Sequence, residues 1–485
     1  MSQKSLTKNS FYFLIYNTLN ILFPLITGIY VSRTLLQVNI GEVAYAQNIT
    51  QYFVTFAFLG IPTYGMREIS KVRKDSEQTA KLFSELFIIN LVSTITFLSL
   101  YIVLVLSISQ FRNNLVLYVI TGCAIALNAM EISWFYEGLE EFGFISIRNF
   151  IFKILSFLLL ILLVKSPSDY LWYAAITVIG TAGNYIVNMF HVPKFLKKIV
   201  LKNLEFKRHM KPILYLVAVN LAIEIYTLVD ITMLGVFASK QSIAIYSYAS
   251  KIQKILLQVI NSFTIVVVPR ISLYYKEKKF DDFNLVLSRT LNLILLLALP
   301  IIVGIFITSN DIITLLYGVN YLPSASVLKI LSLMITVSPI GYLLGSRVML
   351  ATGNESKMLI AVFIGAVVNF IGNFFLIQQF SEYGSAIASV IGEIVVMVVY
   401  INFGRRYFKL KPLRTNLSKI IKATVAMFLV IAVYQMFQLP LIIKIISEII
   451  IAAVIYFGML YLLKEETIDT NLNKILRRFG FKTLG

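Results

Sequence analysis

The chain has 485 residues, of which 58% are apolar by a broad count and 14% are charged, against about 25% charged residues in an ordinary soluble domain. Its mean hydropathy of +0.82 excludes a soluble globular protein. It also excludes a disordered or nucleic-acid-binding chain, because such a chain needs a polar sequence. Lysine and arginine number 43 against 24 acidic residues, a formal net charge of +19. The first question is where along the chain that positive charge lies.

Apolar runs bounded by charged residues or by glycine, proline and asparagine recur along the whole chain. A helix needs about 20 mostly apolar residues to cross a bilayer. The runs are continuous rather than alternating, so they predict helices and not a barrel. The first run lacks a small-residue cleavage site, and we interpret it as a span rather than a signal peptide. The predicted spans are 11–35, 41–63, 82–107, 115–137, 146–164, 170–191, 212–236, 243–268, 286–308, 323–350, 358–379, 384–402, 419–437 and 440–463.

The basic residues indicate how the spans are oriented. If the N-terminus is cytoplasmic, 33 of the 43 basic residues lie in inner segments, 3 lie in outer connections and the other 7 lie inside spans. Inner loops of membrane proteins are enriched in lysine and arginine. The sequence therefore predicts an all-α polytopic membrane protein with about 14 transmembrane helices and both termini in the cytoplasm.

Two halves are predicted from the order of the spans. Six spans in 1–191 are followed by a cytoplasmic basic linker, 192–211, and by six more spans in 212–404. The region 405–463 adds a basic connection and two further helices, and 464–485 is a cytoplasmic tail. A six-span half returns to its starting side, so the two bundles should be parallel and should enclose a central cavity. An offset of 203 pairs Tyr45 with Tyr248, Ala46 with Ala249, Ile49 with Ile252 and Arg67 with Arg270.

The few residues that could bind metal or form disulfides point to neither kind of site. A single cysteine, Cys123, excludes an intramolecular disulfide. Both histidines, His191 and His209, lie in or beside the basic linker, where we expect solvated side chains and no metal site.

A polar face runs along the predicted span 243–268. Ser247, Lys251, Lys254, Gln258 and Asn261 follow one another at steps of three and four, which places them on one side of a helix. A charge at the bilayer centre costs at least about 2.5–3.5 kcal/mol. This face should therefore line an aqueous cavity or meet acidic partners, and Lys251, Lys254 and Gln258 are candidate substrate-binding residues.

Neutral polar residues occupy comparable positions in the first two spans. Asn17 and Asn20 lie on the first span, and Asn48 and Gln51 lie on the second. They can either face the cavity and bind substrate or hydrogen-bond between helices. Arg33 lies near the outer end of its span, where it can reach the surface or contribute to substrate binding.

Among the acids within the predicted spans, four are candidate functional residues: Glu131, Glu224, Asp230 and Glu393. They can pair with the intramembrane lysines, or they can bind the proton or Na⁺ whose gradient would drive transport. No phosphate-binding loop is present, and no paired-carboxylate, Ser-His-Asp or H-E-x-x-H arrangement lies at a membrane face. We therefore expect a transporter without catalytic residues, metal or cofactor, rather than an enzyme.

Several segments resemble bacterial oligosaccharide flippases, of the O-antigen or polysaccharide repeat-unit type, in the multidrug/oligosaccharidyl-lipid/polysaccharide exporter superfamily. The resemblance covers about 8–463. It rests on FLGIPTYGMREISKVRKD (58–75), WFYEGLEEFGFISIRNFIFKIL (134–155), VDITMLG (229–235), YSYASKI (246–252), VVPRIS (267–272), LLYGVNYLPSASVLKILS (315–332) and SEYGSAIASVIGE (381–393). The predicted 14 spans favour this branch over the 12-span drug exporters.

The resemblance implies two bundles that rock about the cavity in the bacterial cytoplasmic membrane. The implied substrate is a short oligosaccharide on a polyprenyl diphosphate, with a polysaccharide polymerase and glycosyltransferases as partners. Lys251 matches a basic cavity position of the related lipid II flippases. The second span departs from those relatives, since no lysine or arginine lies between residues 34 and 66.

Three other functions fit less well. A multidrug or other small-molecule exporter should have an acidic cavity, whereas the face of 243–268 is basic. A membrane glycosyltransferase or polymerase needs polar catalytic loops, but the predicted outer connections are short. A channel would lack the two-half repeat.

Overall fold

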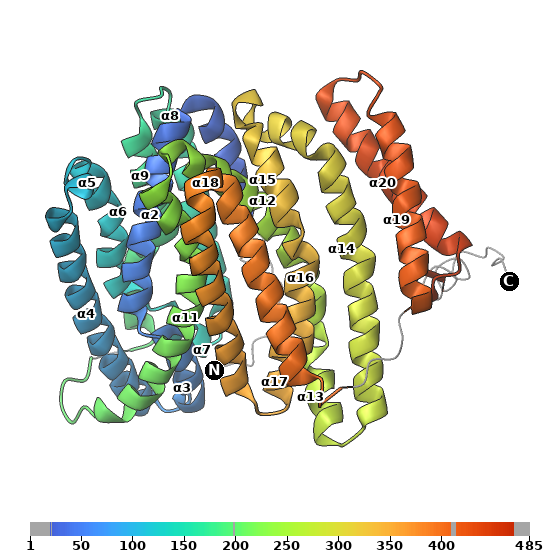
Figure 1. Cartoon of the computed structure of the whole chain (residues 1–485). Coiled ribbons are helices and arrows are strands. Elements are labelled where there is room, and N and C mark those ends of the chain that lie inside the picture. Colours follow the sequence, from blue (N-terminus) through green and yellow to red (C-terminus); the bar gives the residue numbers. More distant parts are fainter. Residues whose placement is uncertain (1–19, 21, 197–198, 409–413, 470–485) are drawn as a thin grey trace. The chain divides into compact units, whose positions relative to one another are not determined.

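The structure is a computed structural model, and it describes residues 20, 22–196, 199–408 and 414–469. Within these residues every regular element is a helix (Figure 1). The chain forms two compact units, Met1–Ala244 and Ile245–Gly485. The sequence instead predicts a linker at 192–211, and the packing of α11 against α2 and α3 explains why the first unit extends further. The predicted domain boundaries, the parallel bundles and the central cavity stay predictions.

The first unit contains eleven helical segments that matter here. Residues 22–34 are helical, and they are followed by α2 (Gln37–Phe58), α3 (Ile61–Val72), α4 (Ser76–Ser107), α5 (Ser109–Arg112), α6 (Leu115–Leu127), α7 (Ser133–Gly138), α8 (Phe142–Leu163), α9 (Tyr170–Val178), α10 (Tyr185–His191) and α11 (Lys207–Phe237). A π-helical turn, Ile179–Gly183, joins α9 to α10.

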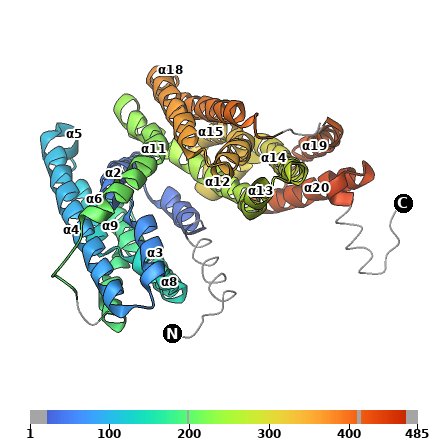
Figure 2. The same cartoon turned by 90° about the horizontal axis from the view of Figure 1, so that it is seen from below.

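The second unit takes up most of α12 and the helices after it. These are α12 (Lys240–Val266), α13 (Val268–Lys276), α14 (Phe280–Tyr317), α15 (Pro323–Ser332), α16 (Met334–Gly341), α17 (Val348–Ala351), α18 (Glu355–Gly404), α19 (Arg414–Tyr434) and α20 (Leu441–Leu462). A π-helical turn, Tyr342–Arg347, precedes α17. Figure 2 shows α19 and α20 beside one another, and both contact α14.

The all-α polytopic membrane fold predicted from the sequence is confirmed. Nine helices in the described part of the chain are long and apolar enough to cross a membrane. The two predicted spans 358–379 and 384–402 form the two arms of α18, which breaks at Ser381 with φ 52° and ψ −127°. Many large apolar side chains on these helices are exposed, for example Val103 (60%) and Val454 (64%). Soluble proteins rarely expose so much contiguous apolar surface. The helices therefore have lipid as their natural surroundings.

The offset of 203 recurs in the structure. Helix α2 begins at Gln37 and α12 at Lys240, which are 203 residues apart. Tyr45 and Tyr248 are both buried, and so are the next two predicted pairs, Ala46 with Ala249 and Ile49 with Ile252. The repeated residues thus occupy similar environments in their own units.

Close packing joins α2 to α11 and to the start of α12 within the first unit. A Cβ atom on Gly235 of α11 would collide with the ring of Tyr45 on α2, and one on Gly41 would collide with the backbone of Lys240. The Lys240 ammonium lies 3.6 Å from the centroid of the Tyr45 ring. Glycine therefore sets the distance between these helices, as small residues commonly do in membrane proteins.

Replacing Gly235 by alanine should weaken this contact. We expect Gly235→Ala to destabilise the protein by about 1–3 kcal/mol, because overpacking forces the Tyr45 ring to move. Gly458 in α20 has no atom near its would-be Cβ, so Gly458→Ala is a matched control that should gain about 0.5–1 kcal/mol from helix propensity. Thermal unfolding in detergent measures both changes. Equal effects of the two variants would contradict the packing argument.

Candidate functional site

The predicted polar face lies on α12, and an aromatic cluster holds its first lysine. The Lys251 ammonium lies 4.8 Å from the centroid of the Tyr248 ring, a cation–π contact. The Tyr248 ring centroid in turn lies 4.2 Å from that of Tyr317 and 4.8 Å from that of Tyr321. All three tyrosines are fully buried. The cluster therefore places a buried aromatic ring against the ammonium of a half-buried lysine.

Lys254 and Gln258 continue this face, one and two turns further along α12. Both side chains are exposed, whereas Lys251 is half-buried. The structure thus places these three candidates along one side of α12. The charge of Lys251 lies against the Tyr248 ring, and the charge of Lys254 is more accessible. Their role in substrate binding stays a prediction.

The two candidates on α2 have different surroundings. Asn48 is buried, and its Nδ2 donates to the Leu228 carbonyl oxygen at 3.2 Å and to Thr232 Oγ1 at 2.7 Å. Asn48 therefore hydrogen-bonds between α2 and α11, which is one of the two alternatives predicted for it. Gln51 is exposed, and its Nε2 lies 3.4 Å from Thr55 Oγ1 on the same helix. Of the pair, only Gln51 remains accessible to a ligand.

The remaining candidates of the first span lie apart from one another. Asn20 is half-buried, and its Oδ1 accepts a 3.5 Å hydrogen bond from Asn149 Nδ2 on α8. Arg33 is exposed near the end of the helix 22–34. Asn17 lies outside the described residues.

Two of the four candidate acids accept hydrogen bonds from neighbouring residues. A carboxylate oxygen of buried Glu131 accepts the Ser133 backbone N–H at 3.0 Å, at the start of α7. Glu393 on α18 accepts a 2.7 Å hydrogen bond from the hydroxyl of Ser338 on α16. On α11, Glu224 is half-buried and Asp230 is buried. The role of these acids in ion binding stays a prediction.

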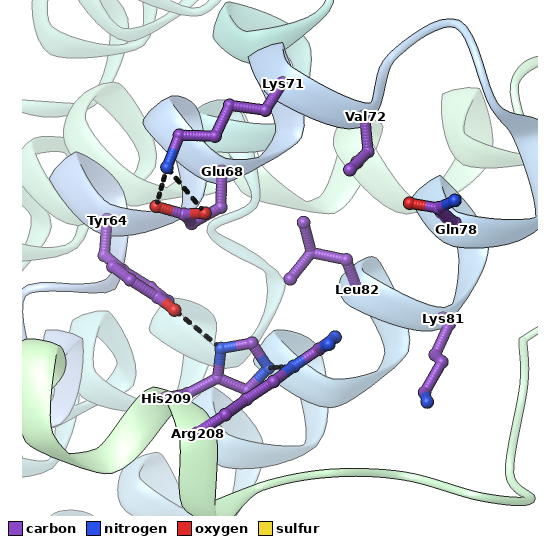
Figure 3. Close-up of a pocket in the computed structure, with 9 residues that line it drawn as sticks. All are labelled: Tyr64, Glu68, Lys71, Val72, Gln78, Lys81, Leu82, Arg208 and His209. Carbon is purple, nitrogen blue, oxygen red and sulfur yellow. Dashed lines mark hydrogen bonds and ion pairs between the residues drawn. The ribbon is translucent and has the colours of Figure 1, made fainter.

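A buried ionic cluster that the sequence did not predict joins α3, α4 and α11. Glu85 on α4 is fully buried, and its Oε2 lies 2.6 Å from Arg208 Nη2 and 2.9 Å from His209 Nε2. The backbone N–H of Glu205 donates to Glu85 Oε1 at 2.7 Å. On the other side of the imidazole, Tyr64 Oη lies 2.8 Å from His209 Nδ1 (Figure 3).

This cluster corrects the expectation of solvated histidines. His209 lies in the first turn of α11, where it hydrogen-bonds to Glu85 and Tyr64 and is only 1% exposed. His191 stacks on Phe144 with ring centroids 3.9 Å apart. The signal in the sequence that could have predicted the cluster is Glu85. This acid lies near the start of an apolar span and could pair with the basic residues of the linker 192–211.

A cavity of about 320 Å³ lies beside the cluster, lined by Tyr64, Glu68, Lys71, Val72, Gln78, Lys81, Leu82, Arg208 and His209 (Figure 3). Lys71 Nζ donates to both Glu68 oxygens, at 2.8 and 3.0 Å. Burial alone would raise the pKa of Glu68, but the hydrogen bond and charge of Lys71, together with Arg67, lower it. Lys81 pairs with Glu205 at 2.5 Å. The charges around the cavity thus largely compensate one another.

Two of the segments quoted above, 58–75 and 134–155, pack against each other in the first unit. A Cβ atom on Gly65 would touch the Trp134 ring at 2.5 Å, and one on Gly138 would meet Ile69 at 2.7 Å. Arg73 forms an ion pair with Glu140 across the same contact. Trp134 and its neighbours form a buried core with α3 and α4. These motifs therefore build one structural element rather than two separate sites.

The fold defines a polytopic helical membrane protein with a cationic stripe on one helix. Over residues 6–275 the chain matches the family described as "Polysaccharide biosynthesis protein", and it belongs to that family. Residues 216–375 also match the MatE family. This membership confirms the resemblance to the multidrug/oligosaccharidyl-lipid/polysaccharide exporter superfamily.

Curated relatives are similar at low identity. The putative O-antigen transporter of Escherichia coli (strain K12) is 22% identical over 416 residues, which cover 83% of this chain and 97% of that protein. The probable low-salt glycan biosynthesis flippase Agl15 of Haloferax volcanii is 24% identical over 259 residues, 53% of each chain.

Solved structures share the fold. The lipid II flippase MurJ, in an inward closed conformation, has a TM-score of 0.72 at 19% identity and covers 94% of this chain and 99% of its own. An inward-facing multidrug resistance MATE family transporter of the MOP superfamily has a TM-score of 0.62 at 15% identity, with 79% and 93% covered. At these identities the likeness establishes the fold alone.

We expect Glu85→Gln to destabilise the first unit. The change weakens the acceptor that Arg208, His209 and the Glu205 N–H share, and a buried donor left without its partner costs about 1–3 kcal/mol. Glu77→Gln is the matched control, since Glu77 is exposed in the first turn of the same helix and should shift stability by no more than about 0.5 kcal/mol. Thermal unfolding in detergent compares the two. A Glu85→Gln protein as stable as the control would show that the cluster does not hold α11 to α4.

Proposed function

We propose that the protein is a flippase for polyprenyl-diphosphate-linked oligosaccharide repeat units. It moves them from the inner to the outer leaflet of the bacterial cytoplasmic membrane by alternating access, and both of its termini lie in the cytoplasm. The products serve capsule, exopolysaccharide or other cell-surface polysaccharide assembly. Family membership and the names of the relatives, an O-antigen transporter and a glycan biosynthesis flippase, support this proposal.

The observation that carries the proposal is the cationic face of α12. Lys251 and Lys254 lie one turn apart in a helical stretch long and apolar enough to cross a membrane. A lysine that faces lipid at mid-bilayer costs at least about 2.5–3.5 kcal/mol. Two lysines on one helix therefore indicate that binding a negatively charged ligand offsets this cost. A diphosphate headgroup is the complementary ligand, because it carries negative charge across hydrocarbon while its lipid tail stays in the bilayer.

In this proposal the two lysines have different roles. The contact with Tyr248 restricts the Lys251 side chain, so less conformational entropy is lost when the substrate binds. The exposed Lys254 and Gln258 then contact the phosphate oxygens or the first sugar. Gln51, Arg33 and Asn20, which belong to the first unit, are separate candidates for substrate binding.

Transport against a gradient needs a coupled ion. We propose that a proton or Na⁺ gradient drives turnover and that Glu224 or Asp230 on α11 binds the ion, with Glu393 as a further candidate. A polysaccharide polymerase and glycosyltransferases would then consume and supply the substrate.

A multidrug exporter is the second candidate, and the likeness to the MATE family transporter favours it. Such a protein would bind cationic drugs and should present acids to them. The lysines of α12 would repel these substrates, so the charge of this face argues for an anionic headgroup.

Neutralising the face tests the function. We expect Lys251→Gln combined with Lys254→Gln to reduce translocation of lipid-linked repeat units by at least about tenfold, because each lost charge-assisted contact contributes about 1.5–3 kcal/mol. Accumulation of the lipid-linked intermediate on the inner leaflet, and loss of surface polysaccharide, measure the effect in cells.

The control replaces two exposed lysines outside this face, Lys276→Gln with Lys422→Gln. It removes the same number of charges and should leave translocation within about twofold of the wild type. Normal export by the Lys251 and Lys254 double variant, at equal protein level, would refute the proposed site.

A further inference from the structure

A second charged network lies in the second unit, where the α19–α20 hairpin packs against α14. It contains Asp311 on α14, Gln435 just after α19, and Lys444 and Glu448 on α20. We propose that Glu448 is a proton-binding site, occupied when the hairpin is docked on α14. The inference concerns this membrane-embedded contact and stands independently of the proposed function.

The hydrogen bonds of the network converge on Gln435. Lys444 Nζ donates to Gln435 Oε1 at 2.7 Å and pairs with Asp311 Oδ2 at 2.9 Å. Gln435 Nε2 then donates to Glu448 Oε1 at 2.8 Å and lies 3.3 Å from Asp311 Oδ2. The amide thus separates the lysine from Glu448, and the lysine charge goes to Asp311.

Glu448 is the buried member of this network. It is 1% exposed, and its Oε2 is buried without a hydrogen-bond partner among the described residues. A bare carboxylate oxygen in an apolar interior is costly when it carries charge. When it carries a proton it becomes a neutral O–H group, and the cost falls.

The charges of the network also leave room for one proton. The network contains two carboxyl groups, Asp311 and Glu448, and a single ammonium, Lys444, which pairs with Asp311. Two carboxylates close together cannot both stay ionised without compensation. The hydroxyl of Tyr434, the residue before Gln435, donates to Ser447. One bound proton on Glu448 therefore makes the contact neutral.

A second buried glutamate in the same unit provides an internal comparison. Glu465 is 0% exposed, and its Oε1 accepts from Asn292 Nδ2 at 2.8 Å. Its Oε2 accepts the backbone N–H groups of Thr467 and Ile468, both at 2.9 Å. Donors to both oxygens suit a charged carboxylate. Glu448 lacks that environment although it is equally buried.

Infrared difference spectroscopy of the full-length protein in lipid nanodiscs tests the site. The wild type minus Glu448→Gln spectrum should contain the C=O band of one protonated carboxyl group, shifted in D₂O. Asp311→Asn should lose the same band, because Glu448 then ionises to balance Lys444. Lys444→Gln should instead add a second protonated carboxyl group, since Asp311 loses its cation.

Glu465→Gln is the matched control, and it should leave the protonated-carboxyl region unchanged. Size-exclusion elution confirms that each variant is folded, and Lys444→Gln provides the second test should Asp311→Asn fail to fold. The proposal is wrong if the wild type and Glu448→Gln spectra agree in this region. It is also wrong if folded Asp311→Asn protein keeps the band, or if folded Lys444→Gln protein gains none.

Discussion

Hydrocarbon does not solvate charge, and the placement of charge in this protein follows from that constraint. Most basic residues lie in predicted cytoplasmic segments, and their number there predicts the orientation of the spans. The lysines inside the helices have specific surroundings: Lys251 lies on the Tyr248 ring, Lys444 pairs with Asp311, and Lys153 lies 4.9 Å from the centroid of the Phe23 ring. These three charges are thus stabilised by local contacts, whereas the exposed Lys254 remains accessible to a ligand.

The helices could be predicted from the sequence because each span must be long, continuous and apolar. The break between two predicted spans even coincides with the kink of α18 at Ser381. Which side of a helix meets a neighbour was harder to predict. Asn48 and Gln51 belong to one predicted polar stripe, yet Asn48 hydrogen-bonds to α11 and Gln51 is exposed. A difference of three positions rotates a side chain by about 60° from its neighbour, and only packing decides which of the two is covered.

Long-range ionic contacts were not predictable for a related reason. Glu85 and His209 are far apart in the sequence, and nothing local indicates that the start of α11 returns to α4. The same holds for Asp311 and Lys444, which come from α14 and the hairpin. By contrast, the structure explains two glycines of the segments 58–75 and 134–155. Gly65 and Gly138 leave the space that Trp134 and Ile69 occupy. Family motifs here mark a structural contact, whereas the proposed substrate contacts lie on α12.

The central claim is that an anionic headgroup is recognised by the lysines of α12. The most direct measurement reconstitutes the wild-type protein in liposomes with two fluorescent lipids that carry the same oligosaccharide, one on a polyprenyl diphosphate and the other on an uncharged polyprenyl ether. The account predicts that the diphosphate lipid crosses at least about tenfold faster, the rate ratio for about 1.4 kcal/mol of preferential stabilisation. Equal rates for the two lipids, or faster transport of the uncharged one, would contradict it.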